Sequence, residues 1–152
     1  MSLRNRISSD LKAAMKAKDA TKLATLRLIN AAIKDREIAA RGEAGATELT
    51  DADLVAVLTR MVKQRRDSAR AYEEAARLDL AEKELAEIAV IESFLPRQLD
   101  EGEMAQAVED TIAELGASSV RDIGKVMGAL KTRYAGQMDF GKAGALVKAR
   151  LA

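Results

Sequence analysis

Two glycines and a lysine near the C-terminal end of the chain have the spacing of a phosphate-binding loop. In "GQMDFGKA", Gly136, Gly141 and Lys142 match the G-x-x-x-x-G-K frame, whose backbone amides and lysine hold nucleotide phosphates. Ala143 stands where a hydroxyl would bind magnesium, and Asp139 places a negative charge inside the loop. The preceding segment has helical periodicity, whereas a phosphate-binding loop follows a strand. We therefore predict no nucleotide site; Gly136 instead ends one helix and Asp139 caps the next.

The side chains that most enzymes use for nucleophilic and acid-base chemistry are scarce. The 152 residues include no cysteine and no histidine, which excludes a thiol nucleophile, a disulfide, an imidazole base and a Cys/His zinc site. Adjacent carboxylates such as Glu73 and Glu74 lie at positions expected to be exposed, and no clustered catalytic set is visible. We therefore expect no catalytic residue, no metal site and no cofactor.

Glycines and cations converge on a helix predicted near residues 120 to 134. Gly124 and Gly128 lie one turn apart beside its apolar stripe, and each costs about 1 kcal/mol relative to alanine. Two glycines at this spacing indicate that something approaches the helix backbone closely. A neighbouring helix of the same bundle fits, and so does a nucleic-acid backbone attracted by the surrounding cations. The candidate nucleic-acid-binding residues are Arg121, Gly124, Lys125, Gly128, Lys131, Arg133, Lys142 and Lys148.

Positive charge is concentrated toward the C-terminal end, although the net charge of the chain is only +1. Residues 97 to 118 hold one arginine and six carboxylates, whereas residues 119 to 152 hold seven cations and two carboxylates. The earlier basic run "KQRRDSAR" is typical of a solvated helix face instead, because Lys63 can reach Asp67 one helical turn later. The C-terminal segment is therefore the basic region that we expect to meet a polyanion.

The elements that position these residues are predicted to be helices throughout. Hydrophobic residues make up 48% of the chain but include only four aromatics, with a single proline, and apolar residues recur at three- and four-residue spacing. We predict about seven helices, the first over residues 3 to 17 with a core stripe that includes Met15, and a loop around Gly42 and Gly45. The expected helix caps are Asp19, Thr50 with Asp53, Asp100 with Glu103, Ser118 or Ser119, and Asp139.

Pro96 is the predicted domain boundary. Proline cannot donate a backbone amide and disfavours helical geometry in the preceding residue, so the helix expected to begin after Asp79 and to run through Leu85 to Leu95 ends there. We predict an all-α protein with an N-terminal domain of about four helices over residues 1–95 and a three-helix C-terminal bundle over residues 96–152.

The location of the protein is inferred from its apolar segments and its N-terminus. No apolar run approaches the roughly 18 residues of a membrane span. The N-terminus "MSLRNRISSDLKAAMKAK" is basic and amphipathic, as in a transit peptide, but Asp10 interrupts it and its apolar stripe serves a core helix. We expect a cytoplasmic protein that makes no membrane contact.

Two long segments resemble a known family. "KQRRDSARAYEEAARLDLAEKELAEIAVIESFLPRQLDEGEM" is similar to the central signature of the YqeY family of small bacterial proteins, and "IGKVMGALKTRYAGQMDFGKAGALVKARL" is similar to its C-terminal module. That module resembles the tail of GatB, the B subunit of the amidotransferase that amidates misacylated tRNA. The tail match falls on Gly124, Lys125, Val126, Met127, Gly128, Leu130, Lys131, Gly136, Asp139, Leu146, Val147 and Lys148.

The resemblance implies an all-helical protein with a tRNA connection, because the related tail is associated with binding the tRNA body. The chain departs from the family pattern at Gln137, where the family often has an arginine, so no phosphate contact is expected at that position. Family members are often labelled carbon-nitrogen ligases with glutamine as amide donor. That reaction needs a glutaminase nucleophile and an ATP- and magnesium-dependent site, which lie in parts of the amidotransferase that this chain lacks.

Three functions from different classes remain open. The leading one is a tRNA-binding or tRNA-amidotransferase-associated helical module without catalysis of its own. The alternative is a protein-interaction adaptor with no nucleic-acid role, and the third is an amidotransferase in its own right. The expected partners are accordingly tRNA and an amidotransferase or another protein.

Overall fold

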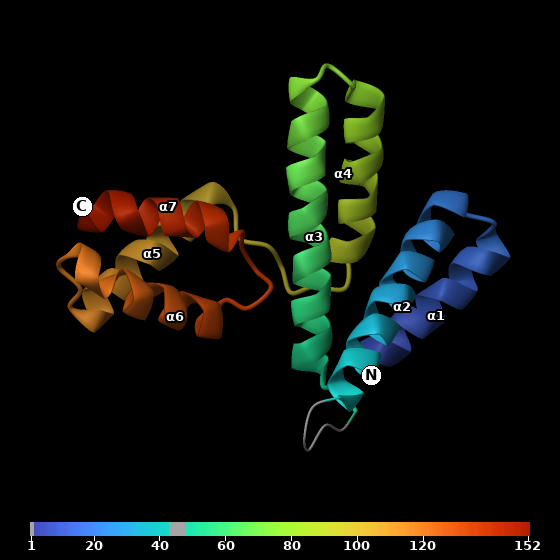
Figure 1. Cartoon of the computed structure of the whole chain (residues 1–152), viewed down its shortest axis with the longest axis horizontal. Coiled ribbons are helices and arrows are strands. Elements are labelled where there is room, and N and C mark those ends of the chain that lie inside the picture. Colours follow the sequence, from blue (N-terminus) through green and yellow to red (C-terminus); the bar gives the residue numbers. More distant parts are fainter. Residues whose placement is uncertain (1, 43–47) are drawn as a thin grey trace. The chain divides into compact units, whose positions relative to one another are not determined.

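The computed structural model describes residues 2–42 and 48–152, and within these residues the chain is all-helical, as predicted (Figure 1). The loop expected around Gly42 and Gly45 is predicted to include residues 43–47, which lie outside the described residues. The elements are α1 (Leu3–Ala17), α2 (Ala20–Arg41), α3 (Asp51–Glu74), α4 (Leu78–Glu92), α5 (Glu101–Leu115), the 3-10 turn η1 (Val120–Asp122), α6 (Ile123–Arg133) and α7 (Phe140–Leu151).

The helices pack into two compact units. Helices α1 to α4 belong to the unit Met1–Pro96, and α5 to α7 belong to the unit Arg97–Ala152. Each unit buries its own apolar cluster, and no residue of either cluster belongs to the other unit. Pro96 is the last residue of the first unit.

Short-range capping interactions set most helix starts. Asp19 accepts a hydrogen bond from the Lys22 amide at 3.1 Å, and Thr50 and Asp53 exchange the two hydrogen bonds of a capping box. These caps satisfy amides that have no partner inside the helix. Helix α4 differs from the prediction, since it begins at Leu78 and has no side-chain cap.

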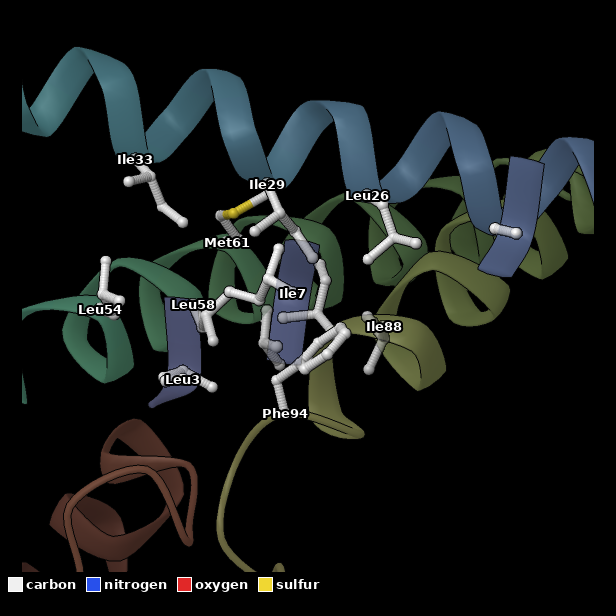
Figure 2. Packing of buried hydrophobic residues seen from close by; sticks show 13 residues of the cluster. Leu3, Ile7, Leu26, Ile29, Ile33, Leu54, Leu58, Met61, Ile88 and Phe94 are labelled. Atoms are coloured by element: carbon white, nitrogen blue, oxygen red, sulfur yellow. The ribbon is translucent and has the colours of Figure 1, made fainter. Parts of the chain in front are cut away.

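The core of the N-terminal unit is formed by aliphatic side chains from all four helices. Figure 2 shows residues of α1, α2, α3 and α4 pointing toward one another, among them Ile7, Ile29 and Leu58, which are at most 1% exposed. Met15, which is predicted to lie in the core, is 54% exposed, and Leu85, an apolar residue of the predicted fourth helix, is 48% exposed. Both lie at the edges of the buried stripes of their helices, where the packed neighbours end, so periodicity alone places them wrongly.

Polar contacts join helix α1 to the C-terminal end of α4 and to the start of α3. The Arg6 guanidinium donates to the Ser93 carbonyl at 3.0 Å and lies 5.6 Å from the centroid of the Phe94 ring. The Leu3 amide lies 3.4 Å from both carboxylate oxygens of Asp51.

In the described ranges, no helix is both long and apolar enough to cross a membrane.

Candidate nucleic-acid interface

The C-terminal unit holds all the predicted nucleic-acid-binding residues on η1, α6 and α7. Helix α5 starts with a capping box between Asp100 and Glu103 and ends at Gly116, whose φ of 64° gives the left-handed conformation of a helix C-cap. The three helices bury a shared cluster in which Val126, Leu130 and Val147 are fully covered. This core fixes which sides of α6 and α7 face solvent.

The turn between α6 and α7 uses its polar groups within the chain. Gly136 has φ 75°, and the Gln137 amide donates to the Tyr134 carbonyl at 2.9 Å. The Asp139 side chain accepts from the Gly141 amide at 2.9 Å and caps α7. Because this carboxylate occupies the start of α7, an anion cannot take the position that a phosphate-binding loop would offer. The prediction that this segment is a turn and helix cap is confirmed.

The two glycines of α6 leave an open stretch of helix backbone. A Cβ atom built at Gly124 or Gly128 meets no described atom within 4 Å. The neighbouring helix that would explain the pair is therefore not found among the described residues. A glycine inside a helix lowers the stability of that helix by about 1 kcal/mol relative to alanine. No close packing contact within this unit offsets that loss at either position.

These glycines share one side of α6 with a lysine. Lys131 follows Gly124 by seven residues, which brings it back to nearly the same side of the helix. A Cβ at Gly144 of α7 would lie 3.7 Å from Met127 Cε, so Gly144 marks where α7 faces α6. The side chain of Lys148, one turn after Gly144, stands beside the same seam. We call Gly124, Gly128, Lys131 and Lys148 the α6–α7 surface.

Two arginines mark the other sides of these helices. Arg133 of α6 pairs with Glu114, and Arg150 of α7 pairs with Glu109, both on α5. These contacts place α5 on the sides of α6 and α7 that carry the arginines, away from the α6–α7 surface. Arg133, a predicted nucleic-acid-binding residue, is therefore engaged with a carboxylate. The Arg150–Glu109 pair is not predicted from the sequence. The feature of the sequence that could have indicated it is the excess of carboxylates on α5.

The remaining predicted cations are exposed and differ in their surroundings. Lys125 lies near Asp122, whose pKa is lowered mainly by hydrogen bonds from the Ser118 and Ser119 amides and to a smaller extent by Lys125. The other four form no ion pair with a described residue; they are Arg121, Lys131, Lys142 and Lys148. Arg121 lies on η1, and Lys142 lies on the solvent side of α7, so only part of the predicted set lies on one surface.

Comparison with known proteins identifies the family. The profile of the family described as Yqey-like protein matches residues 4–151, nearly the entire chain. The chain belongs to the YqeY family.

Several yeast proteins named "Altered inheritance of mitochondria protein 41, mitochondrial" are similar to this YqeY-family chain. The protein from Lachancea thermotolerans is 32% identical over 115 residues, which cover 74% of this chain and 59% of the relative. The Clavispora lusitaniae protein is 43% identical over 86 residues, 57% of this chain and 47% of the relative. The Saccharomyces cerevisiae YJM789 protein is 28% identical over 127 residues, 80% of this chain and 66% of the relative. The chain thus spans about half to two thirds of the length of these relatives.

These relatives correct two predictions. They are yeast proteins, so the description of the family as bacterial is wrong, and they are named as mitochondrial, which contradicts the predicted cytoplasmic location. The bacterial description came with the family resemblance, whereas the cytoplasmic prediction rests on the lack of a long apolar run and on the core role of the first helix. Leu3 and Ile7 of that helix are buried, but burial of an apolar stripe carries no information about the compartment or the organism.

Proposed function

We propose that this YqeY-family protein is a tRNA-binding helical module, associated with amidotransferase chemistry in a complex and without an active site of its own. The observation that carries the proposal is the open backbone of α6 at Gly124 and Gly128, which no described atom covers. A partner that must come close to the helix backbone would account for two glycines that destabilise α6.

The cations beside the glycines favour a phosphate backbone as that partner. Lys131 and Lys148 are exposed at the α6–α7 surface and have no carboxylate partner among the described residues. Contacts of this kind hold a nucleic acid through its charge and shape without reading bases. The chain has only four aromatic residues, so stacking on single-stranded bases would contribute little.

The proposal assigns different roles to the two units. We take α5 to α7 as a domain similar to the GatB tail, which supplies the RNA contact, and α1 to α4 as a separate helical domain. The resemblance supports a place beside an amidotransferase. It does not supply the nucleophile or the ATP site of that enzyme, so we expect no glutamine-dependent amidation of Glu-tRNA by the purified chain.

Alanine substitution of the α6 glycines separates RNA binding from folding. Because a Cβ at either position meets open space, Gly124→Ala and Gly128→Ala should each raise the free energy of unfolding by about 0.5 to 1 kcal/mol. The same substitutions should weaken tRNA binding severalfold in electrophoretic titrations. A weaker complex from a more stable protein cannot be attributed to unfolding.

Gly116→Ala is the matched control. This glycine also has open space around it but has φ 64°, so alanine should destabilise the unit by about 1 kcal/mol while leaving tRNA binding unchanged. If the wild type shows no salt-sensitive tRNA binding at micromolar concentration, or if the double glycine variant binds as well as the wild type, the proposed interface is wrong.

A protein-interaction adaptor is the second candidate, and one observation favours it. Leu78 and Leu85, seven residues apart on α4, are 62% and 48% exposed and lie on one side of that helix. An exposed pair of this kind suits a partner helix. Leu78→Ser with Leu85→Ser should then abolish capture of a protein partner that survives nuclease treatment, and should leave tRNA titrations unchanged.

A further inference from the structure

The most basic part of the protein lies outside the α6–α7 surface, in the first two helices. Residues 2 to 41 hold ten cations and four carboxylates, a surplus of six positive charges. The unit of α5 to α7 holds eight of each, because the acids of α5 balance its basic end. The cations of the first two helices are Arg4, Arg6, Lys12, Lys16, Lys18, Lys22, Arg27, Lys34, Arg36 and Arg41.

The carboxylates of this helix pair do little to reduce the charge of its solvent face. Glu37 pairs with Arg4 at 2.9 Å, and Asp19 accepts from the Lys22 amide as the cap of α2. Asp35 lines a hollow of about 460 Å³ that α2 shares with α3, on another side of α2. Asp10 is the only carboxylate within α1 itself.

Three cations form a row along α2. Arg27, Lys34 and Arg41 follow one another at seven-residue intervals, which repeats nearly the same side of the helix about every 10.5 Å. All three are exposed, and none forms an ion pair with a residue of the described ranges. The Arg4–Glu37 pair joins α1 to α2 next to this row, and the two helices run side by side in opposite directions (Figure 1).

The row borders a hollow between α1 and α2 that suits an anion. The hollow has a volume of about 310 Å³, and its polar lining is Arg4, Asn30, Lys34, Glu37 and Arg41. Three cations and an amide thus surround one carboxylate, which Arg4 already neutralises. A phosphate group placed here would meet several donors with no unpaired negative charge beside it.

We propose that the row and its hollow form a second phosphate-binding surface, which holds another stretch of the same RNA; we call Arg4, Arg27, Lys34 and Arg41 the α1–α2 surface. This inference rests on the proposed function and extends it to the N-terminal unit. An evenly spaced row of cations matches a polymer with regularly spaced charges. An anionic membrane fits less well, because Asp35 interrupts the exposed apolar residues of α2, and only Leu28 and Ile38 among them are large.

Charge neutralisation along the row tests the inference. We expect Arg27→Gln with Lys34→Gln and Arg41→Gln to weaken tRNA binding about tenfold at 0.1 M salt. The slope of log affinity against log salt should become shallower by about 2 to 3, because each lost phosphate contact removes roughly 0.7 to 0.9. The control replaces three other exposed cations, Arg60, Arg70 and Lys83, by glutamine, and should change affinity less than about twofold at the same net charge.

Further measurements distinguish a failure of the proposed function from a failure of this inference alone. If the wild type does not bind tRNA, the proposed function fails together with this inference. If Lys131→Gln with Lys148→Gln removes binding while the α2 triple variant keeps the wild-type affinity and salt slope, only the inference is overturned. If the triple variant loses binding to vesicles with 30% anionic phospholipid and keeps its tRNA affinity, the α1–α2 surface is a lipid site and the inference is also overturned.

Discussion

Glu103 carries a carboxylate that the first turn of α5 holds in its ionised form. The Arg97 guanidinium donates to both of its oxygens at 2.9 and 2.7 Å, and the Asp100 amide donates to it at 3.1 Å. The arginine first and the amide second lower the pKa of Glu103 to about 2, from an ordinary value of 4.5. A carboxyl group with a depressed pKa stabilises the fold above its unfolded-state pKa and loses that contribution as pH falls toward the folded-state value.

The stability difference between the wild type and Glu103→Gln should therefore depend on pH. We expect the variant to be less stable near pH 6 and the difference to shrink as pH is lowered from about 5 to 2, since protonation removes the same interaction from the wild type. Amide hydrogen exchange of α5 across this range measures the effect. A stability difference that stays the same from about pH 6 down to about pH 2 would contradict the assignment.

At the scale of the elements, an ion pair joins α3 to α4. Arg65 and Glu87 are 2.9 Å apart, with only 15% and 14% of their side chains exposed, and Arg65 also donates to the Met61 carbonyl. Glu87→Ala leaves this arginine without its carboxylate in a mostly covered site, so the free energy of unfolding should fall by about 1 to 3 kcal/mol in urea titrations. Asp67→Ala breaks the exposed Lys63–Asp67 pair and should cost less than about 0.5 kcal/mol. If the two variants lost the same free energy of unfolding, burial of the ion pair would not determine its contribution to stability.

Elements with local signals are predictable from the sequence, and pairings between elements are not. Asp19, Thr50, Asp100 and Asp139 cap the helices predicted for them, because a cap depends on residues within one turn. The partners of Arg133 and Arg150 lie on another helix, so only the packing of α5 reveals which cations are neutralised. The open space at Gly124 and Gly128 likewise depends on the absence of neighbours, and the sequence alone leaves both a neighbouring helix and a nucleic acid open there.

At the scale of the whole molecule, the two separate cores imply that damage to one unit stays within it. Leu58 of α3 and Leu130 of α6 are both fully buried, each in the apolar cluster of its own unit. Truncation of either to alanine removes the transfer free energy and leaves a cavity, a loss of about 2 to 5 kcal/mol. Because a smaller domain buries a smaller fraction of its surface on folding, we expect the unit Arg97–Ala152 to have less stability to lose than the unit Met1–Pro96.

Leu130→Ala should therefore increase amide hydrogen exchange in α5, α6 and α7 and leave α1 to α4 protected, whereas Leu58→Ala should do the reverse. This pattern is expected because the two apolar clusters share no residue. It also bears on the RNA surfaces, since Leu130→Ala would then weaken binding at the α6–α7 surface while the α1–α2 surface stays folded. If either substitution raises exchange equally in both units, the two cores unfold together and the protein behaves as one cooperative domain.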